Sequence, residues 1–446
     1  MRLLKQITVI ALVIVMMTTP ARALGLIRDA EIEQLMADYS RPLLIAAGLE
    51  PERVGIALVN NKSLNAFVAN GQNMYIFTGL ILEAEEPNMV IGVIAHEIGH
   101  ITGGHLARGG EARARAQGPA LIATILGLGS ILAGAGDVGM ALIAGGQQFA
   151  QRSYLRYSRG QEAAADITAL QLLEATGQSP QGIIGMMDEL ANQEILSEVY
   201  QDPYARSHPM SRDRVNAYIQ GAKDSDYFEA EDAPALIDRH NMAKAKIYGF
   251  LDKPTTTLRR YKDDNSQPGR YARAIALYRQ GRQQAAVNMV DGLIAEMPDN
   301  AYLYELKGQI YYETGNAAKG IAPYEKSVAL LPDEPLLRIG LATCQLGVGA
   351  NGGEANRAVN EAAIANLRRA LREDPSNSTA FFQLSKGFGQ LGQTAMAQWA
   401  LAEYYAGIGS PEAAMHAQRA LKGLPKGSVE YVRAVDILSS ASGRRR

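Results

Sequence analysis

The chain has 446 residues, of which 47% are hydrophobic and 20% are charged, and its formal net charge is −2. This composition is typical of a globular protein of about two domains, and the near-neutral charge argues against nucleic acid as the main partner. Because the chain contains one cysteine, Cys344, an intramolecular disulfide is excluded.

Residues 1–23 have the pattern of a secretory signal. Arg2 and Lys5 form its positive end, residues 7–17 are apolar, and a small-x-small triplet ends at Ala23. The apolar run is short for a bilayer span, so we expect cleavage near Ala23 and an extracytoplasmic mature protein.

The next elements are a helix and three short strands. Residues 27–47 have apolar positions at helical spacing, which predicts an amphipathic helix packed on the catalytic domain. Asn70-Gly71 between two β-like runs indicates a hairpin. The last run precedes the motif below and could offer a free edge to an extended peptide, although an ordinary edge strand fits equally well. The three predicted strands are residues 54–59, 64–68 and 74–77.

The strongest motif is HEIGH at residues 96–100, inside an apolar helical run that starts near Met89. Residues four apart project from one face of a helix, so both imidazoles can bind one tetrahedral Zn²⁺ while Glu97 acts as general base. Burying these groups in an apolar helix without such a role would be costly. His105 would point about 140° away from His100 on a continued helix, and we therefore exclude it as a ligand.

Residues 119–144 are rich in Gly, Ala, Leu and Ile, and Asp137 is their only charged residue. A Gly-rich interruption at 134–139 divides the segment, which predicts two short apolar helices joined by a turn. Four interpretations stay open: a buried hairpin of the core, a cover over the active site, contact with a membrane surface, and a transmembrane span.

A second helix is predicted at residues 158–174. Glu162 and Asp166 are four apart and therefore share one face, and the alanines between them allow another helix to approach closely. Such a pair is a weak signal alone. Together with HEIGH upstream, it supplies a carboxylate ligand from a second helix.

These motifs resemble a known family. HExxH, SRxxExxAD downstream of it, and Asn-Ala-Phe before a strand are similar to the HtpX and CAAX-prenyl-protease metallopeptidases of the gluzincin clan, over about residues 28–220. The resemblance implies one Zn²⁺ per chain, bound by His96, His100 and Glu162.

The same resemblance implies further roles. Glu97 would activate water, and Asp166 would support a ligand histidine. His208 matches the family's His-Pro position, which implies either a removable fourth zinc ligand or a stabiliser of the oxyanion. The structural alternative is a histidine that caps a helix starting near Ser211.

The C-terminal part has a different periodicity. Residues 226–268 are polar and predict a connecting region with one helix, in which His240 faces solvent. Pro298 and Pro332 then lie 34 residues apart, the tetratricopeptide (TPR) period. About four such repeats predict a solenoid that binds protein segments and has His416 on its surface.

We therefore expect an α+β zincin-like metallopeptidase domain, mostly helical with a small sheet, followed by an all-α TPR solenoid. The domain is expected at 24–225, the connecting region at 226–268, the repeats at 269–440 and a disordered tail at 441–446.

The predicted chain resembles the BepA-like subgroup of the family, which combines a signal sequence and C-terminal repeats with the absence of transmembrane helices. This implies a periplasmic zinc metalloendopeptidase in quality control and assembly of outer-membrane proteins, whose repeats bind misassembled substrates or the assembly machinery. The alternative is a latent peptidase, shut by His208 and residues 119–144, that acts mainly as an assembly chaperone or scaffold. In a third interpretation the repeats serve only oligomerisation. Peripheral membrane contact through 119–144 would be an additional interaction.

Overall fold

The computed structural model describes residues 25–105, 117–128, 136–192, 208–209, 211–350 and 354–443. The predicted signal and the last three residues of the tail lie outside these ranges. The chain divides into two compact units. Unit 1 is Met1–Ile27 with Ser40–Ala230, and unit 2 is Arg28–Tyr39 with Glu231–Arg446.

Unit 1 contains a four-stranded sheet in the order β1-β2-β4-β3. β2 (Ile56–Val59) pairs in parallel with β4 (Asn73–Phe77), while β1 (Leu26–Ile27) and β3 (Ala66–Ala69) pair antiparallel at the two edges. Asn70 and Gly71 both have positive φ and join β3 to β4, which confirms the predicted hairpin.

The free edge of the sheet differs from the expectation. β4 lies between β2 and β3, so it cannot offer its edge to a peptide, and β3 is the edge strand that contacts the HEIGH helix. The local sequence could not reveal this, because the parallel pairing of β2 with β4 joins strands that are separated by β3 in the sequence.

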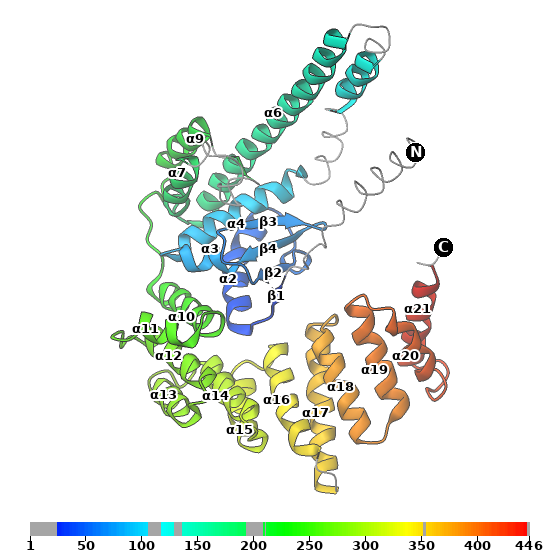
Figure 1. Ribbon diagram of the computed structural model, residues 1–446. Coiled ribbons are helices and arrows are strands. Elements are labelled where there is room, and N and C mark those ends of the chain that lie inside the picture. The colour runs from blue at the N-terminus through cyan, green and yellow to red at the C-terminus, as the bar shows by residue number, and fades with distance from the viewer. Residues whose placement is uncertain are drawn as a thin grey trace, which may run out of the picture. The chain divides into compact units, whose positions relative to one another are not determined.

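The HEIGH motif lies on α4 (Pro87–Thr102), which follows α3 (Thr78–Glu83) and ends just before Gly103, as predicted. α4 packs against α6 (Gly136–Thr176), as Figure 1 shows. Gly99 permits this contact, since a Cβ there would lie 2.8 Å from the Ala165 carbonyl oxygen. The remaining helices of unit 1 are η1 (Pro51–Arg53), η2 (Gln181–Ile183), α7 (Ile184–Asn192) and α9 (Arg212–Lys223).

α6 is longer than the sequence indicated. It joins the second half of the apolar segment to the helix predicted at 158–174, because the Gly-rich interruption falls before or within its first turn. A separate helix at 117–128 precedes it. Large apolar side chains on both helices are exposed, so the interpretation as a buried core hairpin is wrong for the described residues. Within those residues, no helix is long and apolar enough to cross a membrane.

Unit 2 consists of paired helices, which confirms the predicted repeat architecture (Figure 1). α10 (Pro234–Leu251) and α11 (Pro254–Arg260) come first, and five successive pairs follow in the part of the chain that the structure describes, one more than predicted. The pairs are α12 (Gln267–Arg279) with α13 (Gln283–Glu296), α14 (Ala301–Glu313) with α15 (Ala317–Leu330), α16 (Pro335–Gly349) with α17 (Glu354–Glu373), α18 (Ser378–Gln390) with α19 (Thr394–Gly407), and α20 (Glu412–Ala420) with α21 (Val429–Gly443).

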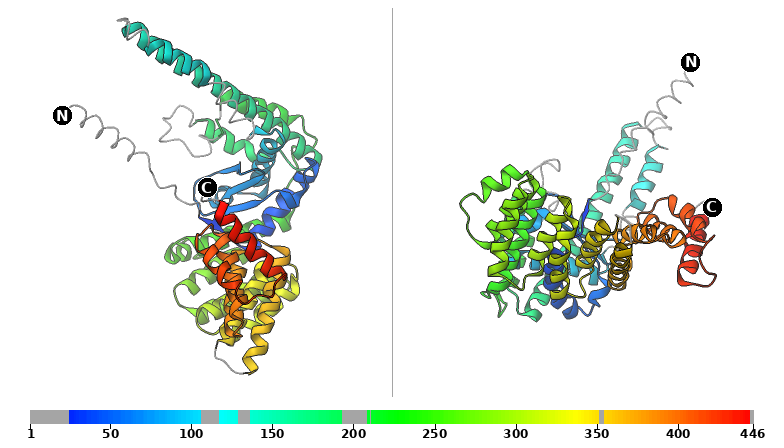
Figure 2. Two further views of the ribbon diagram at one scale, coloured as in Figure 1. Left: turned by 90° about the vertical axis from the view of Figure 1, so that its right-hand side faces the viewer. Right: turned by 90° about the horizontal axis from the view of Figure 1, so that it is seen from below.

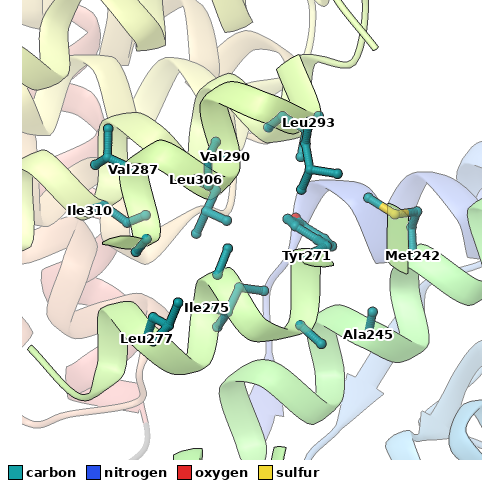
Figure 3. Packing of buried hydrophobic residues seen from close by; sticks show 14 residues of the cluster. Met242, Ala245, Tyr271, Ile275, Leu277, Val287, Val290, Leu293, Leu306 and Ile310 are labelled. Atoms are coloured by element: carbon teal, nitrogen blue, oxygen red, sulfur yellow. The ribbon is translucent and has the colours of Figure 1, made fainter. Parts of the chain in front are cut away.

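The apolar positions of the repeats form the core between helices. Figure 3 shows Tyr271 and Ile275 of α12 near Leu293 of α13 and Leu306 of α14, all of them buried. In the next pair, a Cβ on Gly308 would lie 2.4 Å from the Tyr324 ring. The small and aromatic positions of the sequence period therefore serve close packing between helices.

α2 (Ala30–Ala46) is divided between the two units. Its first part packs within unit 2, where Glu31 accepts a hydrogen bond from the Tyr271 hydroxyl at 2.9 Å. Tyr39 Oη lies 3.1 Å from His240 Nδ1. The expectation that this helix packs on the catalytic domain is therefore wrong for its first part.

Two histidines of unit 2 also differ from their predicted environment. His240 is completely buried, and His416 is buried with its Nδ1 2.8 Å from Gln398 Oε1. Both were predicted to lie at the surface. The sequence could not indicate their burial, because their hydrogen-bond partners lie on other helices.

Candidate metal centre

Three segments of unit 1 meet at the predicted site. α4 presents His96, Glu97 and His100 on adjacent turns, and α6 presents Glu162. His208 lies just ahead of α9, whose N-cap is Ser211, so the cap of this helix is the serine and His208 faces the other groups. All are buried except His100, which is partly exposed.

Four side chains each direct one donor atom to a common point. His96 Nε2 lies 3.1 Å from His100 Nε2 and 3.4 Å from Glu162 Oε2, and His100 Nε2 lies 3.5 Å from Glu162 Oε1. His208 Nδ1 lies 3.3 Å from His96 Nε2 and 3.1 Å from Glu162 Oε2. The four donors are all within 4.8 Å of one another.

These separations fit a metal ion. A tetrahedral zinc site with ligand distances near 2.0–2.1 Å has edges of about 3.4 Å, close to the separations between these donors. Three nitrogens and a carboxylate oxygen are also the donor types that zinc binds in proteins. The residue types and these separations therefore fit a tetrahedral divalent ion.

Asp166 and Arg214 hold the first of these histidines. His96 Nδ1 lies 2.9 Å from Asp166 Oδ1, which leaves Nε2 to face the other donors. Arg214 donates to the same carboxylate from Nε at 2.5 Å and from Nη2 at 2.8 Å, and its Nη1 is 2.9 Å from Glu162 Oε2. Arg214 therefore links the two carboxylates of α6.

His105 has a comparable place beside His100. Their Nδ1 atoms are 2.9 Å apart, so His100 also turns Nε2 toward the donors. His105 itself does not belong to the four-donor group, in agreement with its exclusion as a ligand.

Glu97 lies beside the donors and is not one of them. Its Oε1 is 3.4 Å from His208 Nε2, and its carboxylate accepts a hydrogen bond from the backbone N–H of Val68 on β3. Burial raises the pKa of Glu97 above its ordinary value. A carboxylate whose pKa is raised toward neutrality is suited to exchange protons with water.

The contacts of His96 and Asp166 shift the pKa values of these two groups in opposite directions. Burial alone would lower the pKa of His96, but hydrogen bonds to Asp166 and Glu162 raise it to about 9. Burial alone would raise the pKa of Asp166, but Arg214 and His96 lower it to about 2. Asp166 is therefore charged at neutral pH, and a proton competes with a metal ion for His96.

Arg214 and His105 were not predicted to have these roles. Arg214 lies six positions after His208, but its partner Asp166 is 48 positions earlier. His105 was considered only as a ligand. No periodicity in the sequence connects either residue to its partner.

Comparison with known proteins agrees with this geometry. Residues 27–220 match the description of peptidase family M48. The metalloprotease LoiP of Escherichia coli is 31% identical over 194 residues, which cover 42% of this chain and 71% of that protein. The chain belongs to peptidase family M48.

Two further relatives match a larger share of the chain. The beta-barrel assembly-enhancing protease of Escherichia coli is 25% identical over 362 residues, 79% of this chain and 71% of that protein. Its counterpart from Yersinia pestis is 27% identical over 296 residues, and the match spans 64% of this chain and 59% of that relative's length. The M48 match includes α4, α6 and most of α9, the three elements that carry or flank the donors.

Proposed function

We propose that the chain is a periplasmic zinc metalloendopeptidase that acts in quality control and assembly of outer-membrane proteins. The observation that carries the proposal is the meeting of the two HEIGH imidazoles with Glu162 from a second helix, next to the buried Glu97. Two histidines and a glutamate are a common ligand set of catalytic zinc in peptidases.

The proposed mechanism assigns one task to each residue. When bound, the zinc ion lowers the pKa of a coordinated water molecule and polarises the substrate carbonyl. Glu97 takes the proton from the attacking water and passes it to the departing amine. Asp166 keeps His96 oriented, because its Oδ1 lies 2.9 Å from His96 Nδ1. Arg214 holds Asp166 in turn, through a hydrogen bond of 2.5 Å from its Nε to Asp166 Oδ2.

Substrate class and location are further parts of the proposal. An extended peptide could pair with the edge of β3, which contacts α4 beside Glu97. The stacked pairs of unit 2 suit the binding of protein segments, either misassembled outer-membrane proteins or their assembly machinery. The names of the longer relatives support this choice, and the predicted signal at 1–23 supports the periplasm.

The test uses the purified chain from Leu24 to Arg446. We expect one zinc per chain and cleavage of a urea-unfolded β-barrel outer-membrane protein. Glu97→Gln should keep the metal and lose about 10²–10⁴-fold in kcat, whereas Glu85→Gln, an exposed residue of the same unit, should change neither. Cleavage that survives Glu97→Gln or complete removal of metal would refute the peptidase mechanism.

A latent peptidase that acts as an assembly chaperone is the second candidate. His208 favours it, because its Nδ1 lies 3.1 Å from Glu162 Oε2 and 3.3 Å from His96 Nε2, so it supplies a fourth donor where water would otherwise bind. His208→Ala should then raise the rate of proteolysis, while loss of cleavage would assign His208 to the oxyanion. Rescue of barrel assembly by Glu97→Gln would support a separate chaperone role.

A further inference from the structure

The helix at 117–128 and the first part of α6, residues 136–150, form a pair that we call the apolar hairpin. Its two arms meet through small residues: a Cβ on Gly146 would lie 2.4 Å from Ala123 Cβ and 3.3 Å from Ala120 Cα. Figure 2 shows these arms side by side, extending away from the sheet of unit 1. The seam between the arms is therefore too narrow for large side chains.

The large apolar residues of the first arm point the other way. At 100° per residue, Leu121, Ile125 and Leu128 fall within about 60° of one another, and Ile122 and Leu126 extend this face to about 160°. All five are more than half exposed. Ala120, Ala123 and Gly127 occupy the opposite, seam-facing side.

The second arm also exposes large apolar side chains, and Met140, which is 61% exposed, lies on the side of the helix opposite to the three residues named next. Val138, Leu142 and Phe149 fall within about 40° of one another on α6, and their exposed fractions are 57%, 38% and 57%. Gly146, on the seam, is buried. Both arms therefore expose large apolar side chains while glycines of the seam, Gly127 and Gly146, are buried, the reverse of a helical pair that folds in water.

The charged residues of the sequence lie outside the apolar hairpin, with one exception. Residues 116–151 contain a single charged residue, Asp137, whereas arginines gather on both sides of this segment, with Glu111 as their one acidic neighbour over residues 108–116. The arginines are Arg108, Arg113 and Arg115 before it, and Arg152, Arg156 and Arg159 after it. An apolar segment bordered by arginines is typical of peptides that enter a lipid surface, where the guanidinium groups meet phosphate headgroups.

We propose that the apolar hairpin inserts into one leaflet of a phospholipid bilayer and attaches unit 1 to the membrane surface. A helix of 12 residues is about 18 Å long, enough to enter one leaflet and too short to cross a hydrocarbon core of about 30 Å. A protein groove would cover one side of the pair. A bilayer surrounds both arms, and both arms expose large apolar side chains.

Binding to vesicles tests the proposal without any need for metal or cleavage, so its failure is distinct from failure of the peptidase mechanism. The chain from Leu24 to Arg446 is mixed with vesicles of phosphatidylethanolamine and phosphatidylglycerol (3:1) and separated by flotation. We expect it to float with the vesicles. The double variant Ile125→Asp/Phe149→Asp should lower the partition coefficient at least tenfold, because both side chains are exposed and their replacement leaves the seam intact.

The matched control is Ile408→Asp/Val432→Asp, two exposed apolar residues of unit 2, which should float like the unchanged protein. A chain that stays with the buffer, or equal flotation of both double variants, would overturn the proposal. Insertion depth is measured with Leu142→Trp, whose added fluorescence should be quenched by lipids brominated on their acyl chains. A blue shift that depends on protein concentration and needs no lipid would instead identify a second copy of the chain as the partner.

Discussion

At the scale of single residues, the candidate metal centre depends on which nitrogen of each histidine faces inward. Asp166 lies 2.9 Å from His96 Nδ1, and His105 lies at the same distance from His100 Nδ1. The two Nε2 atoms are consequently only 3.1 Å apart, and their lone pairs repel unless a proton or a cation lies between them. The surrounding residues therefore prepare the ligands before any ion arrives.

His105 is expected to tune metal affinity. His105→Phe removes the acceptor of the His100 Nδ1 proton, so His100 can rotate, and we expect zinc affinity to fall by about 10–100-fold. His105→Gln keeps an acceptor and should lose much less. Competition with a chromophoric chelator measures both variants, and equal affinities for the two would argue against this role.

At the scale of elements, the distance between α4 and α6 depends on one glycine. Gly99 lies between His96 and His100, and a Cβ there would be 2.8 Å from the Ala165 carbonyl oxygen and 2.9 Å from its Cα. Because the obstructing atoms are backbone, they can yield only if α6 moves. Since α6 carries Glu162, any such shift also changes the ligand geometry.

Gly99→Ala should therefore destabilise unit 1 by about 1–3 kcal/mol and weaken zinc binding. Gly160→Ala is the control, since this glycine of α6 is exposed and a Cβ there meets nothing within 4 Å. It should stabilise the helix by about 0.5–1 kcal/mol. Calorimetric unfolding of both variants measures the two effects, and a Gly99→Ala protein as stable as the parent would show that α6 adapts freely.

The elements also show what the sequence could and could not predict. The HEIGH helix and the turn at Asn70-Gly71 could be predicted, because apolar spacing and positive φ are local properties. The repeats could be predicted from their 34-residue period. The place of β4 inside the sheet and the contact of Arg214 with Asp166 could not, because they depend on segments that are distant in the sequence.

At the scale of the whole molecule, the two units are interleaved along the chain. Residues 28–39 belong to unit 2, although unit 1 precedes and follows them. Lys246 of α10 holds this segment, with its Nζ 2.8 Å from Asp29 Oδ2 and 3.3 Å from Glu31 Oε2. Burial alone would lower the pKa of Lys246, but these carboxylates raise it, so the amine stays charged.

Removal of residues 231–446 should therefore loosen only part of α2. We expect amide hydrogen exchange to accelerate at residues 30–39, which lose their partners, and to change little at Leu43 and Leu44 in the same helix. Mass spectrometry with peptide resolution distinguishes the two parts. Unchanged exchange along the whole helix would show that residues 28–39 do not need unit 2.

The divided α2 also constrains the order of folding. Residues 28–39 are synthesised before unit 1 is complete, and the remaining helices of unit 2 follow only after all of unit 1. The loop between residues 28–39 and the rest of unit 2 is long, and contacts across it form slowly. Leu35 and Met36 are buried in the folded protein, and until those contacts form we expect them to be exposed to water or bound by a chaperone. Completion of unit 2 is therefore a late event in the maturation of this protein.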